Sequence, residues 1–206
     1  MSIPALSIFI PTFFFVSITP GMCMMLAFTM GMSVGLRRTM WMMTGELLGV
    51  GLVASLSAIG VAAVMLNYPG LFVFLKYGGG VFLCYQGLQL WLSRGKLAFK
   101  LEGSDYDGLS RCALSFQGFI TAIANPKGWA FFIALLPPFI DYEQDVHTQL
   151  VTLIILILLL EFLCLLIYAG GASRLRALLV NSGNVKFINR IAGSLMLGVG
   201  VWLALS

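Results

Sequence analysis

Long apolar blocks occupy most of this chain and leave little that could form a water-soluble domain. Of the 206 residues, 60% are hydrophobic and 10% are charged, whereas soluble globular chains carry about 25% charged residues. So few charges are not enough to cover a core with a hydrated surface. Apolar blocks of about 20 residues are typical of helices that cross a lipid bilayer. The sequence therefore predicts an all-α integral membrane protein.

Six of these blocks are long enough to cross the hydrocarbon layer, so we expect six transmembrane helices. The expected helices cover residues 4–32, 39–66, 69–93, 112–140, 148–172 and 186–205. Almost no sequence remains outside them, and the whole chain, 1–206, is interpreted as a single transmembrane domain.

Basic residues alternate between the loops that join these helices. They are Arg37 and Arg38 in the first loop, Arg94, Lys96, Lys100 and Arg111 in or beside the third, and Arg174, Arg176, Lys186 and Arg190 in or beside the fifth. The second loop has no charge, and the fourth has acidic residues and His147 without Lys or Arg. Basic loops stay in the cytoplasm, which predicts a multi-pass protein of the bacterial inner membrane with both termini in the periplasm. These loops also account for the net charge of +4, so nucleic acid is not an expected partner.

The two halves of the chain resemble each other. At one constant offset, Phe74, Gly80, Gly87, Leu90 and Ser93 align with Phe187, Gly193, Gly200, Leu203 and Ser206. Three helices per half is an odd number, so the second half must cross the bilayer in the opposite sense. We therefore expect two inverted three-helix repeats, 1–93 and 112–206, joined by a cytoplasmic loop at 94–111. Many secondary transporters are built in this way.

Helix-breaking groups lie near the middle of the first and fourth expected helices. They are Thr19-Pro20-Gly21 and Asn125-Pro126-Lys127. A proline inside a helix removes an N–H and clashes with the preceding turn, and the freed backbone groups must be buried in protein or line a wet cavity. A simple kink is the structural alternative. Two breaks at matching places favour a substrate site in which half-helix N–H groups hold a carboxylate.

Three charged side chains are expected inside the membrane. Lys127 lies near the bilayer centre, where a lysine is costly and faces a partner or a cavity. Glu161 lies within the apolar run 150–166, where a carboxyl group is either salt-bridged or protonated, and a protonated group can carry protons. Glu46 is a second candidate for proton coupling, with snorkelling to the cytoplasmic face as the alternative.

The four cysteines, Cys23, Cys84, Cys112 and Cys164, show neither CxxC nor His/Cys spacing. A disulfide framework and a zinc site are therefore not indicated. Methionines and Cys23 in 22–43 would suit a soft metal ion, but apolar filling of membrane helices explains them. We expect no catalytic residue, no metal site and no cofactor, and we therefore do not expect an enzyme.

At these residues the chain resembles the LysE/RhtB-type amino-acid exporters. The likeness is carried by Thr19-Pro20-Gly21 with Gly31 and Gly35, by Asn125-Pro126-Lys127 with its continuation to Pro137-Pro138-Phe139-Ile140-Asp141, and by the glycine-rich third helix with Tyr85, Gly87 and Trp91. It covers essentially the whole chain. The resemblance implies six helices and efflux of amino acids or close derivatives, driven by the proton gradient. The family's first motif usually continues Pro-Gly-Pro, whereas Met22 follows Gly21 here.

Our leading hypothesis is an exporter of small amphipathic amino acids that exchanges substrate for protons. Lys127 and the half-helix N-termini hold the carboxylate, and Glu161, with or without Glu46, takes the proton or the substrate amine. Rocking of the two repeats alternates access. A transmembrane thiol-electron carrier is an alternative, although the position that matches Cys23 beside the second break is Trp129. Metal-ion efflux is another, disfavoured by the single histidine. The sequence does not name the substrate, and it leaves a monomer and a homodimer both open.

Overall fold

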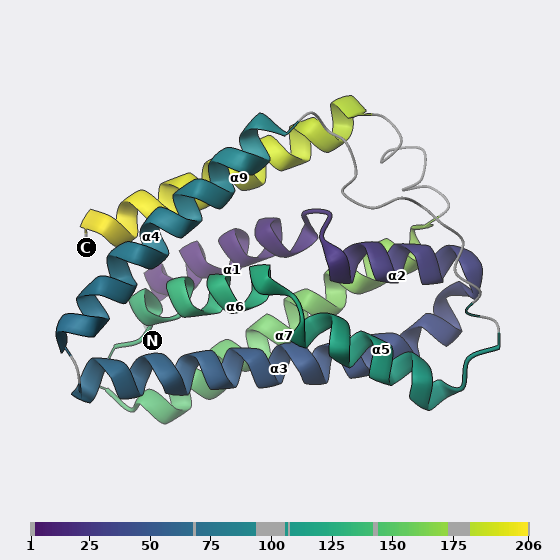
Figure 1. The fold of residues 1–206 in the computed structure, drawn as a ribbon, viewed down its shortest axis with the longest axis horizontal. Helices are drawn as coiled ribbons and strands as arrows, with labels where there is room; N and C mark the ends of the chain where they lie inside the picture. The colour runs from purple at the N-terminus through teal and green to yellow at the C-terminus, as the bar shows by residue number, and fades with distance from the viewer. Residues whose placement is uncertain are drawn as a thin grey trace.

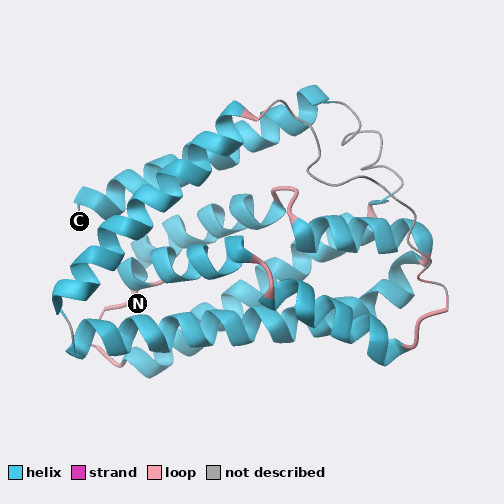
Figure 2. Ribbon diagram, viewed as in Figure 1, coloured by secondary structure: helices cyan, strands magenta, loops and turns pink. Residues whose placement is uncertain are grey.

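The computed structural model describes residues 3–67, 69–93, 106, 108–141, 144–172 and 182–205. Within these ranges the chain forms α-helices and one short 3-10 helix and contains no β-strand (Figure 2). The predicted all-α class is confirmed. Most of the expected cytoplasmic loop 94–111 lies outside the described residues, and so do Arg174 and Arg176 of the fifth loop.

Each predicted membrane helix coincides with one helix or with a broken pair. The helices are α1 (Ile3–Ile18), α2 (Met22–Ser33), α3 (Gly35–Asn67), α4 (Pro69–Leu92), α5 (Arg111–Ile123), α6 (Pro126–Leu135), η1 (Pro137–Phe139), α7 (Val146–Gly170) and α9 (Ser182–Leu205). Among the described residues, the segment Gly35–Gly60 of α3 and the whole of α7 are long and apolar enough to cross a membrane. The bent pair α1–α2 is a third candidate.

The first predicted break separates α1 from α2. The chain bends by 57° from the first helix to the second, and the connection consists of Thr19, Pro20 and Gly21. Pro20 has no N–H with which to continue the helix. Gly21 is extended, with φ −134° and ψ −173°, so the chain leaves helical geometry before α2 begins.

The second predicted break separates α5 from α6. Pro126 is the first residue of α6, a position where its missing N–H costs nothing because the first N–H groups of a helix have no partner within the helix. Asn125 precedes it as the N-cap, and its side-chain oxygen accepts a hydrogen bond from the Lys127 backbone N–H at 3.1 Å.

Aromatic rings hold α1 against the second broken pair. The ring of Phe13 lies 5.8 Å from that of Phe131 and 6.1 Å from that of Phe132, between centroids. The ring of Phe9 packs edge-on against Phe139 of η1 at 5.1 Å. All five rings are buried. This packing places the half-helices on either side of the two breaks next to each other.

Helices α3 and α5 form one close-packed pair. A Cβ atom added at Gly45 of α3 would lie 1.7 Å from the Ser115 carbonyl oxygen, and one added at Gly118 of α5 would lie 2.1 Å from the Met42 carbonyl oxygen. Real Cβ atoms do not approach other atoms within 3.0 Å. Small residues thus let the two backbones touch, as is common between membrane helices.

Helices α4 and α9 form a second close-packed pair, which runs antiparallel along one edge of the molecule (Figure 1). A Cβ at Gly87 would lie 2.7 Å from the Gly193 carbonyl oxygen, and a Cβ at Gly200 would lie 2.7 Å from the Gly80 carbonyl oxygen. The thiol of Cys84 lies between these glycines and points to the Leu197 carbonyl oxygen at 3.9 Å.

A Gly118→Ala substitution is expected to destabilise the protein, because the new methyl group would overlap the backbone of α3. Overpacking of this kind costs about 1–3 kcal/mol and should lower the midpoint of thermal unfolding in detergent by several degrees. Gly198→Ala is the matched control, since nothing lies within 4 Å of a Cβ at that glycine. Equal midpoints for the two variants would contradict the close contact of α3 and α5.

Candidate functional site

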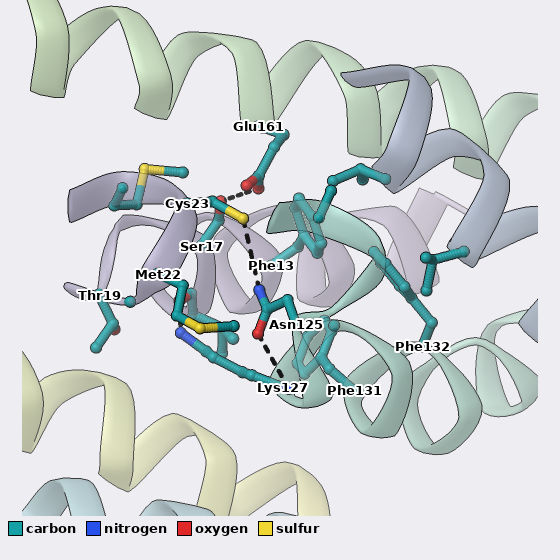
Figure 3. Close-up of a pocket in the computed structure, with 17 residues that line it drawn as sticks. Phe13, Ser17, Thr19, Met22, Cys23, Asn125, Lys127, Phe131, Phe132 and Glu161 are labelled. Atoms are coloured by element: carbon teal, nitrogen blue, oxygen red, sulfur yellow. Dashed lines mark hydrogen bonds between the residues drawn. The ribbon is translucent and has the colours of Figure 1, made fainter. Parts of the chain in front are cut away.

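A cavity of about 60 Å³ lies where the two breaks meet. Its polar lining consists of Ser17, Thr19, Cys23, Asn125, Lys127 and Glu161. Its apolar lining includes Phe13, Val50, Val53, Ala122, Phe131 and Phe132. Residues from α1, α2, α3, α5, α6 and α7 therefore contribute to one internal space (Figure 3).

The carbonyl groups freed at the end of α1 are satisfied by side chains. The Thr19 hydroxyl donates to the Phe15 carbonyl oxygen at 2.8 Å. From α6, the Lys127 ammonium donates to the Val16 carbonyl oxygen at 2.8 Å, and from α7 the Tyr168 hydroxyl donates to the Ile18 carbonyl oxygen at 2.8 Å. Cations are favourable at a helix C-terminus, so this contact helps to hold Lys127 inside the protein.

The start of α2 differs from the start of α6. Gly21 is the N-cap of α2 and has no side chain with which to accept a hydrogen bond from the first N–H groups. In α6 the Asn125 side chain supplies such an acceptor. The first N–H groups of α2 therefore remain available at the cavity wall, where Gly21 and Met22 both stand.

The Lys127 ammonium lies close to this start of α2. The position that a Cβ on Gly21 would take is 3.9 Å from the Lys127 Nζ. A helix N-terminus carries a partial positive charge, and a lysine ammonium carries a full one. The two together make this part of the cavity a place that attracts an anion.

The Glu161 carboxyl group approaches the cavity from the side opposite to Lys127 (Figure 3). It is 8% exposed, and the Ser17 hydroxyl donates a hydrogen bond to it. Lys127 and Glu161 interact electrostatically, yet among the described residues no direct ion pair joins them. The cavity thus has a positive and a negative side.

The Glu46 carboxyl group is fully buried beside the cavity rather than in its wall. Neither of its oxygens has a hydrogen-bond partner within the described part of the chain. It interacts electrostatically with Glu161 and with the Cys23 thiol. A buried carboxyl group without a partner is costly, which favours a functional role over a purely structural one.

Five of the eight residues predicted for the site line the cavity: Thr19, Gly21, Asn125, Lys127 and Glu161. Pro20, Pro126 and Glu46 do not; the prolines shape the breaks, and Glu46 lies behind the wall. Sequence reasoning missed Ser17 and Tyr168, which bond to the site's groups. Tyr168 lies on the buried face of α7 that also carries Glu161 and Cys164, and this helical spacing was a signal for it.

The alternative of a thiol-electron carrier is disfavoured because Trp129, and not a second cysteine, lies beside the second break. Cys23, Cys84, Cys112 and Cys164 are all free. The Asn125 side-chain amide lies 3.6 Å from the Cys23 sulfur, and Trp129 beside the second break donates its ring N–H to the Ile123 carbonyl oxygen at 2.8 Å. Over the described ranges, no group of three or more His, Cys, Asp or Glu residues is placed to hold a metal ion.

These features define the chain as a helical membrane protein with a charged internal cavity, an arrangement typical of proteins that move small molecules across a bilayer. The sequence matches the model of the LysE type translocator family over residues 14–206. The chain belongs to this family, and the resemblance found from its motifs is confirmed.

Several relatives match along almost their whole length. A homoserine/homoserine lactone efflux protein of Salmonella typhimurium is 26% identical over 91% of this chain and 90% of its own. A leucine efflux protein of Enterobacter sp. is 26% identical over 93% of this chain and 90% of its own. A membrane protein of Vibrio cholerae is 27% identical over 91% and 90% of the two chains. No solved structure matches the chain.

Proposed function

We propose that this protein exports an amino acid or a close derivative across the inner membrane in exchange for protons. The observation that carries the proposal is the separation of charge in the cavity. Lys127 and the open start of α2 lie on one side and Glu161 on the other. A free amino acid has a carboxylate and an ammonium group and matches this pattern. The efflux relatives support the same class of substrate.

The carboxylate of the substrate would bind the Lys127 ammonium and the first N–H groups of α2. The ammonium group would bind Glu161, which Ser17 already orients. The walls between these groups are apolar and include Phe13, Phe131 and Phe132. Such walls favour a small amphipathic side chain over a charged one.

The cavity of about 60 Å³ has room for a few water molecules, since each needs about 10–15 Å³ of such a volume. Ligand pockets are usually about 300–1,000 Å³, so the cavity must enlarge before it can hold an amino acid. Substrate entry requires the half-helices beside the two breaks to separate. The Lys127 bond to Val16 crosses from α6 to α1, and we expect it to open in that step.

Proton exchange is assigned to the two carboxyl groups. Glu161 would hold the substrate ammonium when ionised and a proton when neutral, so that one replaces the other. Glu46 interacts with Glu161 and would accept or return that proton. Because the substrate and the proton compete for the same carboxyl group of Glu161, the binding of one releases the other, and this competition is sufficient for antiport.

The proposed topology is one domain of six spans in two inverted repeats, with both termini in the periplasm. In Figure 1 the starts of α3, α5 and α9 lie toward one end, and the N and C marks lie at the other. The glycine contacts of α4 and α9 support the inversion. When the two halves are aligned, Gly80 matches Gly193 and Gly87 matches Gly200. The structure brings Gly87 against Gly193 and Gly200 against Gly80. Replacing each glycine by its match turns one contact into the other, as a two-fold axis between antiparallel helices requires.

Efflux from preloaded cells tests the proposal. Cells with and without the protein are fed dipeptides, and all amino acids in the medium are profiled over time. We expect selective accumulation of one or a few amino acids when the protein is present. Cells with the cavity variant Lys127→Met, in which export at low internal substrate concentration should be weaker, serve as the comparison. An unchanged profile for every amino acid would overturn the proposal.

A further inference from the structure

A second hollow lies outside the candidate site, on the surface between α1 and α9. It has a volume of about 490 Å³ and is lined by Phe15, Phe187, Arg190, Ile191, Ser194 and Leu195. Four of these six side chains are apolar. The groove opens on the outside of the helix bundle, where the surroundings of a membrane protein are lipid.

Trp91 of α4 holds the two polar groups of this groove in place. Its ring lies under the Arg190 guanidinium, 4.9 Å from centroid to carbon, and its ring N–H donates to the Ser194 hydroxyl oxygen at 3.2 Å. Arg190 and Ser194 are four residues apart on α9, so they share one face of the helix. Because the hydroxyl accepts from Trp91, its own proton is free to be donated elsewhere.

Arg190 has no acidic partner within the described part of the chain. Its contact with Trp91 is a cation–π interaction, which leaves the N–H groups of the guanidinium for an anion. An arginine beside an apolar groove in a membrane protein calls for a negative group to offset its charge. Lys186, exposed one turn earlier on α9, adds to the positive potential.

We propose that this groove binds an anionic phospholipid. One acyl chain lies along Phe15 and Leu195, deeper in the bilayer, and the phosphate accepts hydrogen bonds from Arg190 and Ser194. Aromatic and basic side chains gather at headgroup depth in membrane proteins, and basic pockets between helices on the cytoplasmic side bind anionic headgroups. The proposal rests on the proposed topology, which puts the start of α9 at the cytoplasmic side, and does not depend on which solute the protein exports.

A second groove in the same molecule provides an internal comparison. It lies between α4 and α6, has a volume of about 190 Å³ and is lined only by apolar residues and glycine, among them Phe74, Gly78 and Phe82. At the offset that aligns the two halves, these three residues match Phe187, Ile191 and Leu195, and Arg190 is matched by Tyr77. The charged element is therefore particular to the α9 groove.

Native mass spectrometry of the purified protein tests the assignment. The protein is equilibrated in detergent with equal amounts of phosphatidylglycerol and phosphatidylcholine of the same chain length, and retained lipids are counted. The wild type should retain phosphatidylglycerol in preference, by about fivefold, the effect expected of one basic side chain at an anionic lipid. Arg190→Gln should remove this preference, and Arg190→Lys should keep part of it.

Arg111→Gln is the matched control, because Arg111 also lies over a tryptophan ring, Trp41, at 5.3 Å but does not line this groove. It should keep the wild-type preference. If Arg190→Gln does not fold, Ser194→Ala and Trp91→Phe replace it, and each should weaken the preference. Equal retention of the two lipids by the wild type would overturn the proposal, and so would a full preference in the folded Arg190 or Ser194 variants.

Discussion

Replacing Lys127 by methionine should reduce export at low internal substrate concentration by about 10- to 100-fold. A hydrogen bond to a charged group contributes about 1.5–3 kcal/mol, and this ammonium is the full positive charge that the cavity offers a carboxylate. Methionine has a similar length and no charge, so the cavity keeps its shape. The measurement is the export rate as a function of internal substrate concentration.

The shape of that curve separates binding from folding. Loss of a substrate contact raises the concentration needed for half-maximal export. Loss of the bond from Lys127 to the Val16 carbonyl oxygen lowers the amount of folded protein, which is measured in the same membranes. Lys186→Met is the matched control, since Lys186 is exposed on α9 and does not line the cavity. Wild-type concentration dependence in Lys127→Met would exclude Lys127 from substrate binding.

Replacing Glu161 by glutamine should remove the dependence of export on pH. The glutamine side chain keeps the size and the hydrogen bond with Ser17 but can neither release a proton nor pair with an ammonium group as an anion. Export driven by a proton gradient should fall by about tenfold or more. The measurement is export from vesicles at several values of the imposed pH gradient, and an unchanged dependence would remove Glu161 from the proton step.

Glu46→Gln completes this experiment, because Glu46 lies behind the cavity wall and does not line it. Exchange of internal for external substrate needs no net proton movement. If Glu46 only passes protons to Glu161, the Glu46 variant keeps this exchange and loses gradient-driven export, whereas the Glu161 variant loses both. Wild-type gradient-driven export by Glu46→Gln would leave Glu161 as the sole carboxyl group in the proton step.

The helix breaks were predictable from sequence because their causes are local. Pro20 and Pro126 cannot continue a helix, and this holds in any tertiary context. The apolar blocks likewise fixed the positions of the helices. The predicted helix starts were less accurate. Helix α3 begins at Gly35, four residues before the predicted residue 39. Gly35 has a positive φ of 77°, which lets the chain turn directly from α2 into α3.

The partners of the charged groups were not predictable. Nothing local indicates that the Lys127 ammonium bonds to the Val16 carbonyl oxygen, 111 residues earlier in the chain. The same holds for Tyr168 and Ile18, which are 150 residues apart. The sequence favours Glu161 over Glu46 for the proton step, because Glu161 lies within an unbroken apolar run, but it does not show which of the two reaches the cavity. The packing of the helices decides this, with Glu161 at the cavity and Glu46 behind it.

The two close-packed helix pairs bear on how the molecule moves. Helix α3 belongs to the first half of the chain and α5 to the second, and the same is true of α4 and α9. A motion that parted the halves would have to pull apart backbones in direct contact at Gly45, Gly118, Gly87 and Gly200. We therefore expect each moving body to contain helices from both halves, in place of the rocking of one repeat against the other that the sequence hypothesis assumed, so that the midpoint of the chain is not the boundary between moving bodies.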